Sequence, residues 1–169
     1  MMDNIILIGY MGCGKTTLGI RLSYHMRIPF VDTDKLIEKN EGREISEIFA
    51  QDGEEAFRQM ETRTIQTLLQ EKARKVISTG GGLPIREENR QLLKQLGTVV
   101  WLKAEPETVY ERVKGDTRRP LLQCEDPLAK IREMTVARSP YYQEAADVVI
   151  QVDGKDFDTI IQEMEGQIR

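Results

Sequence analysis

Short runs of apolar residues alternate with longer amphipathic segments along the whole chain. The apolar runs predict five strands, at residues 4–8, 29–31, 75–78, 98–102 and 147–152. The segments between them predict helices at residues 15–26, 35–40, 46–51, 54–72, 87–95, 106–114, 128–145 and 156–168. Three residues are typical of helix starts: Pro106 at a first helical position, and Ser46 and Asp156 as caps.

The alternation of strands and helices indicates the fold class. Strands that are apolar almost throughout belong to parallel sheets covered on both faces, so we expect a three-layer α/β fold. Residues 1–169 contain neither repeats nor a low-complexity linker, which predicts a single domain. The least regular segment is residues 115–127, which is polar and rich in turn-forming residues, and we expect it to be mobile.

Composition excludes several classes of partner. The chain of 169 residues is 40% hydrophobic and 31% charged, as in ordinary globular proteins. A net charge of -4 argues against a basic nucleic-acid-binding surface. Two cysteines are too few for a disulfide framework, and neither a membrane-spanning run nor a signal peptide is present. We therefore expect a cytoplasmic protein without nucleic-acid or membrane partners.

The first apolar run leads into a motif that points to chemistry. Residues 9–16, GYMGCGKT, fit the phosphate-binding pattern G-x-x-x-x-G-K-[ST]. Glycines allow successive backbone N–H groups to curl around a phosphate, and the following helix adds the partial positive charge of its N-terminus. Lys15 is expected to bridge phosphate oxygens and Thr16 to ligate Mg²⁺. The motif predicts binding of ATP with Mg²⁺ and leaves the acceptor open.

Two carboxylates follow the second predicted strand. Asp32 and Asp34 are two residues apart, so on an extended segment both would point the same way, at the sheet edge where ligands bind. One could act on Mg²⁺ and the other on an acceptor hydroxyl. The alternative is that Asp34 only caps the next helix.

The third predicted strand runs directly into three consecutive glycines, Gly80, Gly81 and Gly82. Bare backbone at this position allows close approach of a ligand, and a plain turn rarely needs three glycines. This strand carries no terminal aspartate, so Mg²⁺ has to depend on Thr16 and another carboxylate. Asp32 is the nearest candidate.

Several arginines have both a functional and a structural interpretation. Arg58 lies beside an apolar stripe with Glu61 one turn on, which fits a surface ion pair equally well. Arg118 and Arg119 lie in the irregular segment, where they are either solvated or able to close over the γ-phosphate. Arg138 falls in the long predicted helix, where a cation also suits the helix dipole.

Six short strings occur in the order of one known family: GYMGCGKTT, VDTD, FRQME, STGGG, RRPLL and ARSPYY. Over nearly its full length the chain resembles the shikimate kinases. That resemblance implies the nucleoside monophosphate kinase fold, with a five-stranded parallel sheet in the order 2-3-1-4-5 and a mobile lid at about residues 115–127. It implies ATP-dependent phosphorylation of the 3-hydroxyl of shikimate in aromatic amino acid biosynthesis, by a monomer.

The resemblance also implies roles for shikimate-binding residues. Asp34 would meet the ring hydroxyls and accept a proton. Arg58 and Arg138 would clamp the carboxylate, which suits the paired donors of guanidinium groups. Gly80, Gly81 and Gly82 would line the ring.

On the nucleotide side, the resemblance makes Lys15 and Arg119 catalytic, Arg119 being the lid arginine, and Asp32 a residue that acts on Mg²⁺ through water. Arg118 has no equally clear counterpart. The expected ATP-binding residues are Gly12, Cys13, Gly14, Lys15, Thr16, Thr17, Arg112 and Arg119. Cys13 occupies a variable position, where it is either a small packing residue or a thiol of lowered pKa.

Two rival functions remain at this level. Another small-acceptor kinase of the same fold, for gluconate or a nucleoside monophosphate, would not need Asp34, Arg58 and Arg138 together. A nucleotide-dependent switch would bind a triphosphate without a small acceptor, and it leaves the triple glycine unexplained.

Overall fold

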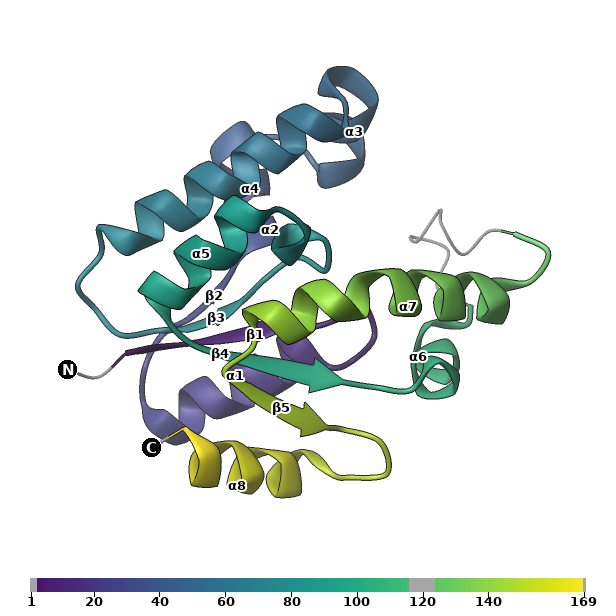
Figure 1. The fold of residues 1–169 in the computed structure, drawn as a ribbon. Coiled ribbons are helices and arrows are strands. Elements are labelled where there is room, and N and C mark those ends of the chain that lie inside the picture. The colour runs from purple at the N-terminus through teal and green to yellow at the C-terminus, as the bar shows by residue number, and fades with distance from the viewer. Residues whose placement is uncertain (1–2, 116–123, 169) are drawn as a thin grey trace.

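The centre of the molecule is a five-stranded parallel sheet with strand order β2-β3-β1-β4-β5 (Figure 1). The structure is a computed structural model and describes residues 3–115 and 124–168. The strands are β1 (Asn4–Ile8), β2 (Phe30–Asp32), β3 (Val76–Ser78), β4 (Gly97–Lys103) and β5 (Val148–Gln151). In the central register Ile6 pairs with Ile77 of β3 and with Val99 of β4. The predicted sheet and its order are confirmed.

Helices connect the strands, as parallel pairing requires. They are α1 (Lys15–Met26), α2 (Thr33–Glu41), α3 (Ile45–Asp52), α4 (Glu54–Leu69), α5 (Glu87–Leu96), α6 (Pro106–Val113), α7 (Pro127–Ala145) and α8 (Phe157–Gln167), with a short 3₁₀ helix, η1 (Leu83–Ile85). Pro106 and Asp156 start their helices as predicted, and the Asp156 carboxylate accepts the Thr159 N–H. None of the helices in the described part of the chain has the length and hydropathy needed to cross a bilayer.

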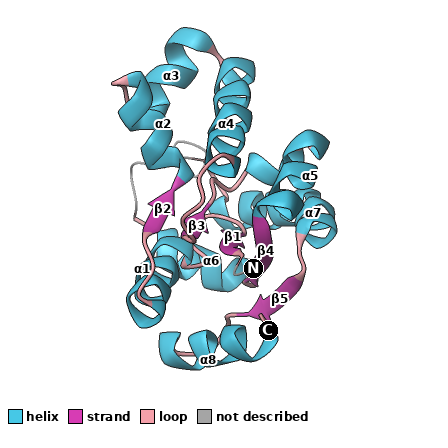
Figure 2. Ribbon diagram, turned by 90° about the vertical axis from the view of Figure 1, so that its left-hand side faces the viewer, coloured by secondary structure: helices cyan, strands magenta, loops and turns pink. Residues whose placement is uncertain are grey.

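Two apolar layers sandwich the sheet because successive strand residues face opposite sides. On β1, Ile5 and Leu7 pack with residues of α1 and α8, whereas Ile6 and Ile8 pack with residues of α4, α5 and α7. Figure 2 shows these two sets of helices on opposite sides of the strands. These four side chains are fully buried, which explains why β1 is apolar after its first residue, Asn4.

Helices α2, α3 and α4 form a separate lobe beyond the β2 edge (Figure 1). Its small core consists of Ile37, Ile48, Phe57 and Met60. The lobe matters for function because α2 begins directly after β2 and α4 carries the stretch around Arg58.

The structure corrects two predicted helix starts. The N-cap of α2 is Asp32, whose carboxylate accepts the backbone N–H groups of Asp34 and Lys35, so Asp34 lies inside the first turn and is not the cap. Helix α3 begins at Ile45 after Glu44, so Ser46 is not a cap either. In both cases the pattern placed the helix one or two residues late, because an acidic or hydroxyl residue suits the first turn as well as the cap.

Candidate active site

The loop after β1, Gly9–Thr16, has the conformation that its glycines predict. Gly12 and Gly14 have φ angles of 74° and 96°, in the left-handed region that side chains disfavour. Gly14 is the N-cap of α1, and no side chain caps this helix or places an acidic group in its first turn. The N–H groups at the start of α1 are therefore available to an anion. We call this segment the phosphate loop.

Lys15 is nearly buried beneath the phosphate loop. Its ammonium donates to the carbonyl oxygens of Gly9 at 2.6 Å and Tyr10 at 3.1 Å, and lies 3.7 Å from the Cys13 sulfur. These contacts hold the charge at the loop, where incoming phosphate oxygens would compete for it. Cys13 is 1% exposed, so its side chain is a packing residue and does not face the pocket.

A pocket of about 280 Å³ joins the phosphate loop to the ends of β2 and β3. Nine predicted site residues line it: Gly12, Gly14, Lys15, Thr16, Thr17, Asp32, Asp34, Gly80 and Gly81. Residues far apart in sequence meet here because β1, β2 and β3 are parallel neighbours whose carboxyl ends share one edge.

The pocket suits a magnesium ion bound with a nucleotide. Thr16 is exposed in the first turn of α1. Asp32 lines the same pocket and uses one carboxylate oxygen to cap α2. Within residues 3–115 and 124–168 no three acidic, histidine or cysteine side chains gather into a metal cage. This donor set fits Mg²⁺, which keeps several waters and phosphate oxygens and takes only one or two protein ligands.

Asp34 and Glu61 bring two carboxylates to the backbone of Gly80. A side chain at Gly80 would begin 2.7 Å from Asp34 Oδ1 and 3.1 Å from Glu61 Oε2, and neither of these buried oxygens has a hydrogen-bond partner. Gly80 itself is held by its N–H, which donates to Thr33 Oγ1 at 3.1 Å. Glycine is required here because any Cβ would occupy the space in front of both carboxylates.

Burial raises the pKa of both acids. Burial raises the pKa of Asp34 to about 6, with a smaller rise from the Asp32 carboxylate, although the nearby Lys15 ammonium acts in the opposite direction. Burial also raises the pKa of Glu61 to about 7, against the lowering effect of its partner Arg58. Two acids with raised pKa values at one glycine are typical of a site that binds or moves protons.

Arg58 forms an ion pair, but not the surface pair that was the alternative. Its Nη1 lies 2.6 Å from Oε1 of Glu61, a side chain with no exposed surface. The guanidinium also lies against the last glycine, since a Cβ at Gly82 would begin 2.6 Å from two of its nitrogens. The buried Glu61 carboxylate thus holds the Arg58 guanidinium in an orientation in which its nitrogens lie beside Gly82.

Arg138, on α7, reaches the neighbouring glycine of the same run. A Cβ at Gly81 would begin 3.3 Å from Arg138 Nη1. Its guanidinium carbon lies 5.4 Å from the centre of the Tyr10 ring, within range of a cation–π contact. Arg58 and Arg138 therefore flank the run Gly80, Gly81 and Gly82, which we call the glycine run.

Arg112 lies on the outer side of the phosphate loop and not in the pocket. Its Nη1 donates to the carbonyl of Gly12 at 3.2 Å and is exposed to solvent. Arg118 and Arg119, with most of the segment at residues 115–127, lie outside the described residues.

Sequence reasoning missed three parts of this site. Glu61 was interpreted only as an ion-pair partner, although its spacing from Arg58 was the correct signal. Thr33 and Tyr142 both bind the glycine run through hydroxyls, to Gly80 and to Gly81 respectively. No local pattern identifies them, because their partners are 47 and 61 residues away.

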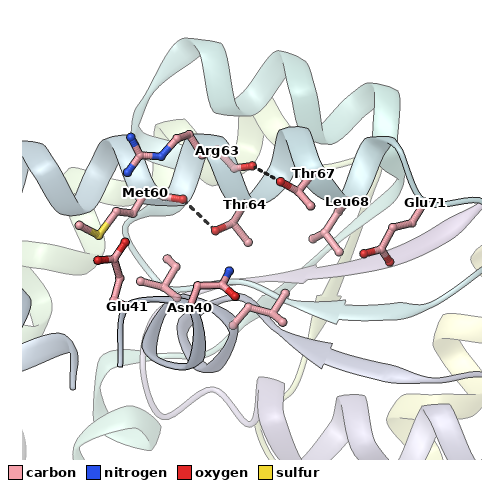
Figure 3. A pocket seen from close by; sticks show the side chains of 10 residues that line it. Asn40, Glu41, Met60, Arg63, Thr64, Thr67, Leu68 and Glu71 are labelled. Carbon is pink, nitrogen blue, oxygen red and sulfur yellow. Dashed lines mark hydrogen bonds between the residues drawn. The ribbon is translucent and has the colours of Figure 1, made fainter. Parts of the chain in front are cut away.

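A second hollow, of about 410 Å³, lies between α2 and α4 on the far side of the lobe (Figure 3). Its walls include Asn40, Glu41, Arg63, Thr67 and Glu71. None of these residues lines the pocket at the phosphate loop. The hollow therefore supplies positions on α4 that can be changed without touching the candidate site.

Comparison with known proteins gives a consistent match. The family model described as shikimate kinase matches residues 11–169. A shikimate kinase of Symbiobacterium thermophilum is 44% identical over 163 residues, 95% of this chain and 93% of that protein. A shikimate kinase of Persephonella marina is 44% identical over 168 residues, 99% of this chain and all of that protein.

Solved structures agree. A shikimate kinase from Acinetobacter baumannii, in complex with shikimate, superposes with a TM-score of 0.90 at 38% identity, over 98% of this chain and 92% of that one. The match extends over the sheet, the lobe and the phosphate loop alike.

Proposed function

Because this chain belongs to the shikimate kinase family, whose reaction is the phosphorylation of shikimate in aromatic amino acid biosynthesis, we propose that its site transfers the γ-phosphoryl group of ATP to the 3-hydroxyl of shikimate. The protein is a kinase, and ATP is its co-substrate. The observation that carries the residue assignment is the glycine run, a strip of bare backbone between two arginines that ends beside Asp34.

The shikimate carboxylate binds between Arg58 and Arg138. Guanidinium groups hold a carboxylate through parallel charge-assisted hydrogen bonds, which orient the ligand as well as bind it. The ring then lies along Gly80, Gly81 and Gly82, where added side chains would collide with Asp34, Arg138 and Arg58 in turn. This arrangement directs the hydroxyls toward Asp34 and the phosphate loop.

Asp34 orients the acceptor hydroxyl and takes its proton. A pKa of about 6 leaves this carboxylate ionised at neutral pH and close enough to neutrality to accept a proton as the O–P bond forms. An alcohol has a much higher pKa, so the proton leaves late in the transfer. Holding the hydroxyl in line with the γ-phosphorus is the larger contribution.

The phosphate loop holds the nucleotide. Its free N–H groups and the Lys15 ammonium neutralise the phosphate oxygens as negative charge moves onto the leaving ADP. Thr16 and, through water, Asp32 would hold Mg²⁺, which supplies further neutralisation of the phosphates when bound. The backbone of Gly12, Cys13 and Gly14, together with Thr17, completes the cradle.

Several assignments rest on the family resemblance alone. Arg119 acts as the lid arginine over the γ-phosphate, and residues 115–127 form the lid. Arg112, which already contacts the phosphate loop, lies near the adenine. The chain works as a monomeric, single-domain cytoplasmic enzyme.

The function is tested by coupled ADP release with ATP and Mg²⁺. We expect strong stimulation by shikimate and none by gluconate or nucleoside monophosphates, because only shikimate offers a ring carboxylate to the two arginines. Stimulation by either of the other acceptors and not by shikimate would reject the proposal in favour of a different small-acceptor kinase. Slow ADP release that no acceptor stimulates would favour a switch.

The raised pKa of Asp34 predicts an acid limb in the rate. Below a pH of about 6 Asp34 is protonated and cannot accept the hydroxyl proton, so kcat/KM for shikimate falls about tenfold per pH unit as the pH decreases. The Glu38 carboxylate contributes to raising this pKa, so Glu38→Gln should move the limb to lower pH by a fraction of a unit. A rate that is flat through pH 6, in protein shown by circular dichroism to stay folded, would contradict the assignment.

A further inference from the structure

The carbonyl oxygen of Gly81 has a partner outside the glycine run. The hydroxyl of Tyr142, on α7, donates to it at 2.6 Å. Tyr142 lies one helical turn after Arg138, and the Arg138 guanidinium lies beside the same glycine. One hydroxyl thus connects the strip of bare backbone to the helix that carries the second arginine.

Arg138 acts on the Tyr142 hydroxyl as well. Burial raises the pKa of Tyr142, while the positive charge of the nearby Arg138 lowers that pKa. The guanidinium lies beside Gly81, whose carbonyl accepts the Tyr142 hydroxyl. Arg138, Tyr142 and Gly81 are therefore polar neighbours, with the Tyr142 hydroxyl fixed on the glycine that the guanidinium faces.

The Tyr142 ring cannot move away from this position. It is 1% exposed and packs against Trp101 of β4, with ring centres 5.6 Å apart and planes tilted by 44°. The Tyr10 ring lies under the Arg138 guanidinium, and the Tyr10 hydroxyl donates to the sulfur of Met134 on α7. The guanidinium thus has an aromatic face and a buried polar glycine as neighbours.

An arginine side chain loses considerable rotamer entropy when a ligand immobilises it. A guanidinium that is already immobilised in the free protein binds a carboxylate more tightly, because less rotamer entropy is lost when the ligand binds. In the proposed complex one shikimate molecule touches both the Arg138 guanidinium and the backbone of Gly81. The distance between these two groups therefore has to match the distance between the carboxylate and the ring of the ligand. The hydrogen bond from Tyr142 fixes Gly81, the glycine against which the Arg138 guanidinium lies.

We propose that Tyr142 is a positioning residue for shikimate, whose hydroxyl holds Arg138 and Gly81 in the arrangement that receives the carboxylate and the ring. This role rests on the proposed function and adds a residue that touches no substrate. The expected effect is on shikimate and not on ATP, because the glycine that Tyr142 binds belongs to the glycine run and not to the phosphate loop.

The test is Tyr142→Phe, which keeps the buried ring and removes only the hydroxyl. We expect KM for shikimate to rise about tenfold, with kcat and KM for ATP within a factor of two, because the hydrogen bond that fixes Gly81 is lost. Tyr141→Phe is the matched control: its ring lies under Arg90, 5.1 Å from the guanidinium carbon, and it is partly exposed on the same helix. That variant should behave as the wild type.

Whether Tyr142 acts through Arg138 is tested by combining the two substitutions in one protein. If Tyr142 acts through Arg138, the Tyr142→Phe effect on KM for shikimate should shrink to less than about twofold in an Arg138→Ala protein, since coupled residues are non-additive. An unchanged KM in the single variant, an equal rise in both backgrounds, or a parallel rise in KM for ATP would each overturn the proposal. Wild-type protein that shikimate does not stimulate would instead reject the proposed function, so the two failures are distinguishable.

Discussion

Asp34→Asn is expected to lower kcat by about 10²-fold to 10⁴-fold, which is the usual contribution of a positioned acid or base. The amide keeps the size of the side chain and can still bind a hydroxyl, so KM for shikimate should change by less than about fivefold. Steady-state kinetics at pH 8, with both substrates varied, separates the two parameters. A loss confined to KM would mean that Asp34 only binds the ring.

The same variant should be more stable than the wild type at pH 8. The folded protein raises the pKa of Asp34 from 3.8 to about 6, so its ionised form is disfavoured by folding and wild-type stability declines as pH rises from about 4 to 6. Asparagine carries no such penalty, which corresponds to about 2 to 3 kcal/mol and a rise in Tm of several degrees at pH 8. At pH 4 the two proteins should unfold together. Less stable Asp34→Asn protein at pH 8 would show that the carboxylate is structural.

Arg58→Ala is expected to raise KM for shikimate by at least about 30-fold, because truncating one partner of a buried charged contact costs about 2 kcal/mol or more. KM for ATP should stay within about twofold, since Arg58 does not line the pocket at the phosphate loop. Initial rates with each substrate varied at saturating levels of the other give both values. Equal losses for ATP and shikimate would mark Arg58 as a structural residue.

Arg58→Ala also leaves Glu61 without its partner in a fully buried position. Some loss of stability follows from that orphaned acid and not from the missing clamp. The double variant Arg58→Ala with Glu61→Gln removes the buried charge, so it should recover stability and keep the high KM for shikimate. Arg63→Ala, on the same helix but facing the α2–α4 hollow (Figure 3), is the matched control and should leave both KM values unchanged.

Most of the fold was predictable because its signals are local. Apolar runs such as Ile5–Ile8 are buried on both faces of a parallel sheet, and this environment requires an apolar residue at each of these positions. The phosphate loop was equally readable, since its glycines and Lys15 serve one conformation within eight residues. Helix starts were less predictable. Asp32 and Asp34 are both suitable N-cap residues, and in the structure Asp32 is the N-cap of α2.

Many of the candidate site residues were proposed from the sequence, but the chemical states of the acids and of Cys13 were not. Asp34 and Glu61 are ordinary acids in the printed chain, and their pKa values rise mainly because the fold buries them beside Gly80. Cys13 has the sequence context of a reactive thiol, yet the fold encloses it. Exposure depends on packing from distant elements, and no local pattern reports it.

Local residue patterns predict a triphosphate-binding loop on a parallel α/β sheet, together with a set of acids and arginines matching one family. The packing of distant elements pairs Arg58 with a buried glutamate, brings Arg138 and Tyr142 to Gly81, and turns two unpartnered carboxylate oxygens toward one glycine. This division follows from the order of the strands. Parallel strands bring the loops after β1, β2 and β3 to one edge, and α7 packs beside that edge, so Tyr142 becomes a hydrogen-bonding neighbour of Gly81, 61 positions away.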